Sequence, residues 1–241
     1  MSARYAFVVP RYGADIAGGA ETLARELALK LAARGDKIEI LTTTARDNRS
    51  WKGELESGTS MDGAITVHRF DVDPRNLEAW IPRQIDISKG IRLSIEDQLE
   101  WMAHSVNASA MYRFIEEEGN RFDALFFAPY LFGTTFWGSL IHPDRSILIP
   151  CLHDETYAYL EILTSMFRQV RGCLFNAVPE MRLARRLYGE IGGDEVGMGF
   201  VPPSREQVES LTPLLPADPY LLYLGRKETA KGVSTLIDDF I

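Results

Sequence analysis

Three short stretches of this 241-residue sequence combine residue types that could bind or transform a small molecule. A glycine-rich stretch covers residues 13–19, a His-Asp-Glu triplet covers residues 153–155, and the sequence GRKETAKG covers residues 225–232. Glycines let a backbone approach a ligand closely, a histidine beside two acids can move protons, and fixed cations can bind an anion. Each stretch is therefore a candidate ligand-binding loop.

The glycine-rich stretch contains Gly13 and the pair Gly18 and Gly19, directly before a predicted helix. The N-terminus of a helix favours an anion, and glycines there would leave room for one. The spacing is not the GxGxxG of dinucleotide-binding proteins, and the lysine of a phosphate-binding P-loop is missing. Taken alone, this stretch predicts either a simple turn or a loop that touches a ligand.

The triplet of His153, Asp154 and Glu155 follows directly on a short apolar run. Such a triplet could serve acid–base chemistry or bind a hydroxyl-rich ligand. The alternative is that Asp154 caps the following helix while His153 packs beside it. We expect no metal site, because the four histidines and the two cysteines, Cys151 and Cys173, lack the spacing of metal ligands.

The third stretch holds Arg226 and Lys231 between a predicted strand and a predicted helix. Two fixed cations and the positive end of a helix dipole suit a diphosphate. A cluster of solvated charges is the alternative, and for this stretch in isolation it is the better-supported interpretation.

Short apolar runs that alternate with longer amphipathic ones must position these stretches. This alternation is typical of βαβ units and predicts an α/β fold with a doubly wound, mostly parallel sheet. We expect the strand at residues 5–10 near the centre of the sheet and the ligand beyond the carboxyl ends of the strands. The other strands are predicted at residues 37–43, 65–70, 124–128, 147–152, 172–176 and 196–200. Helices are predicted at residues 21–33, 134–141, 155–166, 178–188 and over most of 88–118, with a polar surface excursion at 44–63.

Residues 1–200 are predicted to form one domain, because their strand and helix signals alternate without a break. Five prolines between residues 201 and 219 interrupt this rhythm and predict a linker around one short helix. A strand at residues 220–225 and a helix from about Gly232 then begin a second domain. Two elements cannot bury a core, so we expect their apolar side chains to be poorly ordered or to pack on a neighbouring surface, and the same apolar face should favour self-association.

Charge and composition exclude several classes of function. Lys and Arg number 26 and Asp and Glu number 34, which gives a net charge of −8 and argues against nucleic-acid binding. The uncharged run at residues 124–141 contains Pro129, Gly133 and Gly138, so we interpret it as a strand, a turn and a helix rather than a membrane span. The N-terminal residues do not read as a signal peptide, so we expect a soluble, cytoplasmic chain with two free thiols.

In combination, three segments resemble the family 4 glycosyltransferases, which are retaining, nucleotide-sugar-dependent enzymes of the GT-B fold. The segments are FVVPRYGADIAGGAETLARELALKLAARGDKIEILTT near the start, LHDE in the middle and YLLYLGRKETAKGVSTLIDDF at the end. The first and the last are specific in combination, since they occur in the expected order. The resemblance extends over the whole chain and corresponds to only the first half of a full-length enzyme.

The resemblance implies two Rossmann-like domains that face each other across a cleft. The acceptor would bind mainly to the first domain and the sugar nucleotide mainly to the second. Residues 1–200 would then be the Rossmann-like acceptor-side domain, residues 201–219 the linker, and residues 220–241 the truncated start of a donor-binding domain.

Residue roles follow from the same resemblance. Arg226 and Lys231 match the cations that hold the donor diphosphate, and the pair Gly18–Gly19 matches the glycine-rich donor-binding loop. His153 matches the histidine near the reacting sugar. Glu155 is a weaker catalytic candidate for the same cleft.

The expected substrates are a nucleotide-diphosphate-sugar donor and a carbohydrate or lipid-linked acceptor, with neither a cofactor nor a metal. A lipid-linked acceptor would bring peripheral membrane contact. The paired glutamates of the family have no counterpart before Ile241, so we expect negligible sugar transfer by this chain alone. Two alternatives stay open, namely a GT-B-fold nucleotide-sugar epimerase and a non-catalytic half-enzyme that binds an acceptor or a partner chain.

Overall fold

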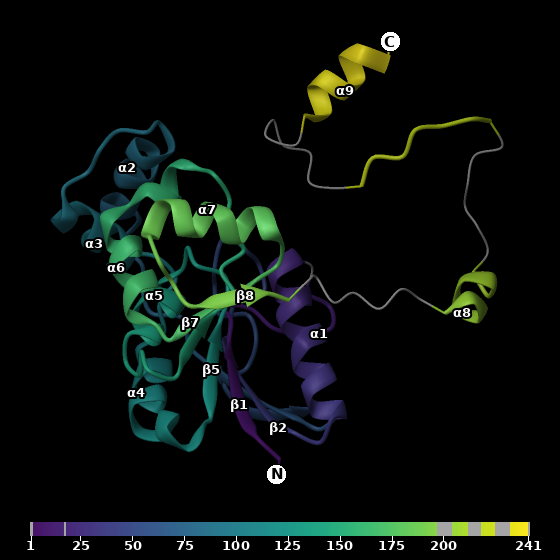
Figure 1. The fold of residues 1–241 in the computed structure, drawn as a ribbon, viewed down its shortest axis with the longest axis horizontal. Coiled ribbons are helices and arrows are strands. Elements are labelled where there is room, and N and C mark those ends of the chain that lie inside the picture. Colours follow the sequence, from purple (N-terminus) through teal and green to yellow (C-terminus); the bar gives the residue numbers. More distant parts are fainter. Residues whose placement is uncertain (1, 17, 197–203, 212–217, 225–231, 241) are drawn as a thin grey trace. The chain divides into compact units, whose positions relative to one another are not determined.

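Within the residues that the structure describes, eight strands form one sheet in the order β3-β4-β2-β1-β5-β6-β7-β8 (Figure 1). The computed structural model describes residues 2–16, 18–196, 204–211, 218–224 and 232–240. The strands are β1 (Arg4–Val8), β2 (Lys37–Thr43), β3 (Gly58–Asp62), β4 (Ile65–Phe70), β5 (Ala124–Phe127), β6 (Ser146–Leu148), β7 (Gly172–Phe175) and β8 (Gly193–Glu195). Of these neighbouring pairs only β3 and β4 run antiparallel, so the sheet is mostly parallel, as predicted.

Helices cover both faces of this sheet, which makes the fold doubly wound. Figure 1 shows α1 (Gly19–Ala33) on one side and α4 (Ser109–Glu118), α5 (Gly133–Ser139) and α6 (Glu161–Gln169) on the other. The region also contains α2 (Leu77–Ser88), α3 (Ile95–Ala103), α7 (Val178–Tyr188) and the short 3-10 helices η1 (Gly119–Arg121) and η2 (Thr156–Tyr159). The predicted α/β fold class is confirmed. None of the described helices is long and apolar enough to cross a membrane.

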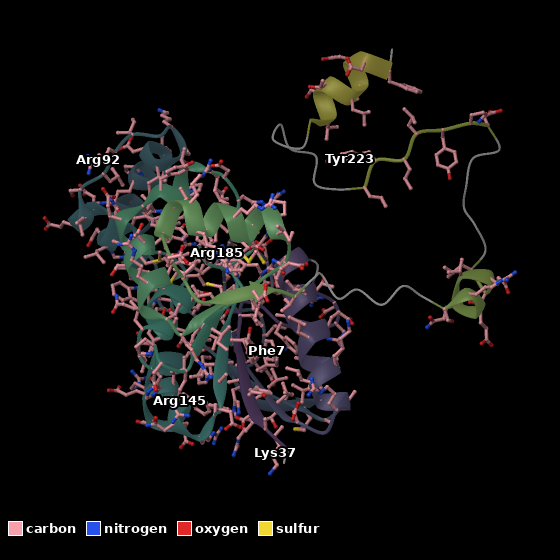
Figure 2. All side chains as sticks on the ribbon, in the orientation of Figure 1. Phe7, Lys37, Arg92, Arg145, Arg185 and Tyr223 are labelled. Atoms are coloured by element: carbon pink, nitrogen blue, oxygen red, sulfur yellow. The ribbon has the colours of Figure 1, made fainter. Side chains whose placement is uncertain are left out.

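Two apolar layers hold the sheet between its helices. Under α1, the side chains of Leu23 and Ala28 pack in one cluster with Ile40 of β2. In the same cluster Phe7 of β1, which Figure 2 labels, stacks on Phe126 of β5 with ring centroids 4.9 Å apart. The second layer lies beneath α4, α5 and α6. Because both faces are covered, the central strands read as continuous apolar runs rather than as alternating ones.

The strand β1 lies in the interior of the sheet between β2 and β5, as predicted for residues 5–10. The strand order reverses at this point, since the chain moves toward one edge from β1 to β4 and toward the other from β5 to β8. Ligands of open parallel sheets bind beyond the carboxyl ends of the strands, near such a reversal. The loops after β1, β5, β6 and β7 are therefore the places where a ligand site is expected.

The prediction of a simple surface excursion at residues 44–63 is wrong. This segment contains β3, which pairs with β4, and the side chain of Trp51, which is only 9% exposed. The strand sequence GTSMD has no apolar alternation and its side chains are mostly exposed. Pairing with the neighbouring strand, rather than burial of side chains, therefore defines β3.

The prediction that residues 88–118 are largely helical is confirmed, but the segment contains two helices, α3 and α4, and begins where α2 ends. The side chain of Ser94 accepts a hydrogen bond from the N–H of Asp97 at the start of α3, and Asn76 caps α2 in the same way. Gly90, with a φ of 73°, lies between α2 and α3. The glycine and the Ser94 cap therefore mark the boundary between these two helices.

Element boundaries near the expected ligand site differ from the prediction as well. The strand β6 ends at Leu148 rather than at residue 152, because Pro150 has no N–H to donate and Cys151 has a φ of 52°. The predicted helix at residues 155–166 is divided into η2 and α6. The strand β8 precedes the strand predicted at residues 196–200, most of which lies outside the described residues.

The chain divides into two units, residues 1–200 and residues 201–241. The second unit contains α8 (Arg205–Glu209) and α9 (Val233–Phe240), and α9 agrees with the predicted helix. The prediction of a strand at residues 220–225 is wrong for residues 220–224, which do not form a strand in the described structure. Large apolar side chains of this unit are exposed, among them Leu221, Leu222, Leu224, Leu236, Ile237 and Phe240. Self-association through them stays a prediction.

Candidate functional site

A pocket of about 790 Å³ opens where the loops after β1, β6 and β7 meet. All three loops leave the carboxyl ends of their strands, which is the edge of the sheet where a ligand is expected. Side chains such as Leu23 and Leu183 make part of its wall apolar. The polar part of its wall is formed by His153, Asp154, Asn176, Glu180, Arg182 and Arg186.

Two residues that the sequence predicts as site residues meet in this pocket. Gly19 is the first residue of α1 and His153 follows β6, and both line the pocket. Gly18 precedes Gly19 directly, whereas Glu155 is not among the lining residues. Two predicted donor-binding residues lie outside the described residues, namely Arg226 and Lys231.

The two glycines of the first loop have different surroundings. A Cβ atom on Gly18 would lie 2.0 Å from Oε2 of Glu21, so this position has no room for a side chain. Glu21 forms an ion pair with the buried Arg11, whose guanidinium carbon is 5.6 Å from the centre of the Trp51 ring. A Cβ atom on Gly19 would meet no other atom within 4 Å. Gly18 therefore leaves the space that the Glu21 carboxylate occupies, whereas Gly19 borders open space that a ligand could enter.

Asp154 bridges two elements at the pocket and does not cap a helix. Its Oδ1 accepts a hydrogen bond from the hydroxyl of Tyr159 at 2.6 Å, and its Oδ2 pairs with Nη2 of Arg186 at 2.7 Å. These two hydrogen bonds hold the pKa of Asp154 below its usual range, and the bond from Tyr159 has the larger effect. His153 is exposed, so its imidazole is accessible to a ligand.

Glu155 is half-buried and contacts the loop that follows β5. Its Oε1 accepts a hydrogen bond from the hydroxyl of Tyr130 at 2.8 Å. Burial, followed by the charge of Glu155, raises the pKa of Tyr130, so this hydroxyl stays protonated and donates. The bond ties the loop after β6 to the loop after β5 and supports the position of the neighbouring His153.

The end of β7 and the first turns of α7 supply lining residues that the sequence analysis missed, including Asn176, Glu180 and Arg182. Arg182 is exposed and has no hydrogen-bond or ion-pair partner within the described ranges, whereas Arg186 on the same helix pairs with Asp154. A signal was present in the sequence. The strand and the helix predicted on either side of Asn176 already place it at the ligand-binding edge.

Cys151 also lines the pocket, but its thiol is unsuited to act as a nucleophile. Burial, followed by the charge of Glu180, raises the pKa of Cys151 to about 12, so the thiol stays protonated at neutral pH. In the described part of the chain, no group of three His, Cys, Asp or Glu side chains could hold a metal ion. An apolar wall, an accessible imidazole and an unpaired guanidinium suit a hydroxyl-rich ligand that carries an anionic group.

Comparison with known proteins gives no family for this chain: no family model matches it, and no curated protein does. Among solved structures, one described as trehalose-6-phosphate from E. coli bound with UDP-2-fluoro glucose matches 77% of this chain with a TM-score of 0.48 and 12% identity. An alpha,alpha-trehalose 6-phosphate synthase from Burkholderia multivorans matches 81% with a TM-score of 0.45 and 10% identity. The matches cover 42% and 49% of those chains, so this chain spans less than half the length of either.

Proposed function

We propose that this chain is the acceptor-side half of a glycosyltransferase. The enzyme would move a sugar from a nucleotide-diphosphate donor to an acceptor hydroxyl with retention, as the resemblance to the family 4 glycosyltransferases implies. The observation that carries the proposal is the meeting of Gly19 and His153 in one pocket. These residues come from distant segments of the sequence, and they are two that the family resemblance had singled out.

In the transfer step, the bond between the sugar carbon and the diphosphate oxygen breaks, and its electron pair leaves with the diphosphate. A bond from the acceptor oxygen to the same carbon forms, and the proton of the acceptor hydroxyl passes to the departing diphosphate oxygen. The proposal assigns to His153 a contact with the donor sugar or the acceptor hydroxyl, and to Glu155 the support of its loop. Arg226 and Lys231 would stabilise the departing diphosphate electrostatically, without a metal.

Arg182 extends the proposal to a further contact in the pocket. Its guanidinium is exposed and unpaired among the described residues, so it can bind an anionic group of the ligand. The first turn of α1, which also lines the pocket, adds positive potential. Gly18 is the N-cap residue of this helix, and no described side chain accepts a hydrogen bond from the first N–H groups there. The apolar wall offers a surface for the ring of a sugar.

Binding of hexose acceptors by the 241-residue chain, and turnover of UDP- and GDP-hexoses by a version extended through the second domain, test this proposal. The nucleotide sugars are titrated with and without hexose acceptors, and the anomeric configuration of any product is read by NMR. His153→Ala and Arg182→Ala should each weaken binding or slow transfer by roughly tenfold or more, as expected for the loss of a hydrogen bond to a charged group. The matched variants His104→Ala and Arg185→Ala, whose side chains do not line the pocket, should behave like the unmodified chain.

The same measurements separate the alternatives. A change in the donor sugar without an acceptor would identify the epimerase, and binding of an acceptor with no turnover in the extended version would identify a non-catalytic module. Equal effects of the pocket variants and their matched controls would contradict the assignment of the pocket.

A further inference from the structure

Glu180 joins the two loops that form the inner wall of the pocket. It lies in the first turn of α7 and is only 8% exposed. Its Oε1 accepts a hydrogen bond from the backbone N–H of Leu152, and its Oε2 accepts one from the backbone N–H of Asn176, each at 2.6 Å. One carboxylate therefore connects the loop after β6 with the loop after β7.

Glu180 makes this connection where the two strands no longer pair with each other. The strand β7 stays paired with β8 as far as Phe175, but its pairing with β6 ends at Cys173, opposite Leu148. Beyond them Cys151 has a φ of 52°, which is costly for a residue other than glycine and persists only where its surroundings impose it. The N–H of Leu152, the next residue, is the group that Glu180 anchors.

The two bonds require a carboxylate rather than an amide. An ionised carboxylate has two accepting oxygens, whereas the amide of glutamine has one and would point its NH₂ group at the second backbone N–H. No ion pair to Glu180 is formed by any residue that the structure describes, so its charge is not placed there to hold a cation. Burial outweighs the two backbone hydrogen bonds and raises the pKa of Glu180.

We propose that Glu180 is a positioning residue of the pocket, which fixes the backbone of residues 151–153 and of Asn176 and thereby holds His153 where it meets the ligand. The identity of the ligand rests on the proposed function. The connection that Glu180 makes between the two loops, called the clamp below, does not rest on it. Glu180 acts through these backbone groups, so no contact with substrate is required of it.

Amide hydrogen exchange measured by NMR on the full chain tests the clamp directly. Glu180→Gln, which preserves size, should speed the exchange of the Leu152 and Asn176 amides by roughly tenfold or more, as expected when a hydrogen bond to a charged acceptor is lost. The backbone ¹³C shifts of Cys151 should move as its positive φ relaxes. The amide of Val9, which bonds to the carbonyl of Leu41 in the middle of the sheet, should exchange as before.

A core variant distinguishes positioning from general destabilisation. Ile40→Val lies in the buried centre of β2 and should lower stability without a selective effect on residues 151–153 or on Asn176. Glu180→Ala, which removes both acceptors, should exceed Glu180→Gln in its effect on these amides. If Glu180→Ala does not fold, the isosteric variant decides alone.

Unchanged exchange at Leu152 and Asn176 in folded Glu180→Gln would overturn the inference. Equal acceleration at Val9 would overturn it too, because Glu180 would then act only on global stability. Failure of the unmodified chain to bind any hexose acceptor would count against the proposed function, and the exchange experiment would still decide the clamp.

Discussion

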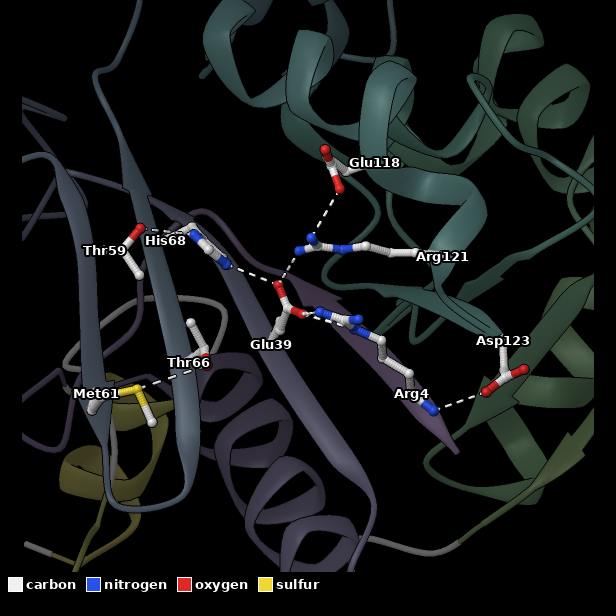
Figure 3. Close-up of polar contacts among 9 residues, drawn as sticks. All are labelled: Arg4, Glu39, Thr59, Met61, Thr66, His68, Glu118, Arg121 and Asp123. Atoms are coloured by element: carbon white, nitrogen blue, oxygen red, sulfur yellow. Dashed lines mark hydrogen bonds and ion pairs between the residues drawn. The ribbon is translucent and has the colours of Figure 1, made fainter. Parts of the chain in front are cut away.

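Two buried carboxylates, one toward each end of the strands, are held in different ways. Glu39, near the start of β2, accepts hydrogen bonds from Arg4 at 2.6 Å, Arg121 at 2.5 Å and His68 at 2.8 Å (Figure 3). Glu180, beyond the opposite ends of the strands, accepts bonds only from backbone N–H groups in the described structure. Charged and imidazole side chains therefore hold the carboxylate of Glu39, whereas backbone N–H groups of two loops hold the carboxylate of Glu180.

The difference is visible in the pKa values. Burial by itself would raise the pKa of Glu39, but hydrogen bonds from His68 and Arg4 and the charge of Arg121 outweigh it and lower the pKa to about 2. Burial raises the pKa of Glu180, because two backbone donors do not compensate for it. The ion pairs of Glu39 therefore stabilise the fold. The two hydrogen bonds of Glu180 position loops at the pocket, and its burial lowers the stability of the folded chain.

The largest effect is expected from Glu39→Ala. This variant leaves Arg4 and Arg121 without their common partner, and removing one member of a buried ion pair costs about 3–5 kcal/mol. The side chains of these arginines are 38% and 30% exposed, so water can solvate them in part and we expect a loss of roughly 2–3 kcal/mol. Urea unfolding at pH 7 measures it. A loss below about 0.5 kcal/mol would reduce this network to an ordinary surface cluster.

A smaller effect is expected at the pocket side, where Gly18→Ala and Gly19→Ala form a matched pair. A Cβ atom on Gly18 would displace Glu21 from Arg11, and overpacking of this kind costs about 1–3 kcal/mol. Gly19→Ala meets open space and should stabilise the chain by about 0.4–1 kcal/mol through the unfolded state. Thermal unfolding compares the two variants. Similar changes in both would show that the Glu21–Arg11 pair, unlike the Glu39 network, tolerates displacement.

The smallest effects are expected in the dependence of stability on pH. The pKa of Glu39 in the folded chain, about 2, lies below its usual 4.5, so its stabilisation is present above pH 4.5 and is lost as the pH falls toward 2. The pKa of folded Glu180 lies above 4.5, so its cost is relieved as the pH falls through that value toward 4.5. Urea midpoints between pH 7 and pH 2.5 should therefore change slope in opposite directions for Glu39→Gln and Glu180→Gln. Slopes that change in the same direction would contradict the claim that the charge of Glu39 stabilises the fold while the charge of Glu180 destabilises it.

The local sequence predicts much of the fold. The strand at residues 37–43 and the helix at residues 178–188 have the predicted boundaries, because apolar continuity and helical spacing are properties of neighbouring residues. The alternation of such segments also predicts the doubly wound sheet and the interior position of β1. Caps such as Asn76 and Ser94 are local signals as well, and they mark the first residues of α2 and α3.

The local sequence does not predict pairing. The strand β3 has no apolar pattern and exists because β4 offers it hydrogen bonds, while residues 220–224 have a strand-like pattern and are not part of a strand in the described structure. Strand formation depends on a second segment, whose position the pattern of the first does not contain.

The sequence by itself determined most of the parallel strands of the first unit, the edge of the sheet where a ligand is expected and the candidates Gly19 and His153. Only the tertiary structure decided that Gly18 makes room for Glu21 and that Glu180 holds the N–H of Leu152. The physical reason is the range of the interactions. Helical periodicity and apolar runs act between neighbours along the chain, whereas a buried carboxylate finds its donors wherever the folded backbone brings them.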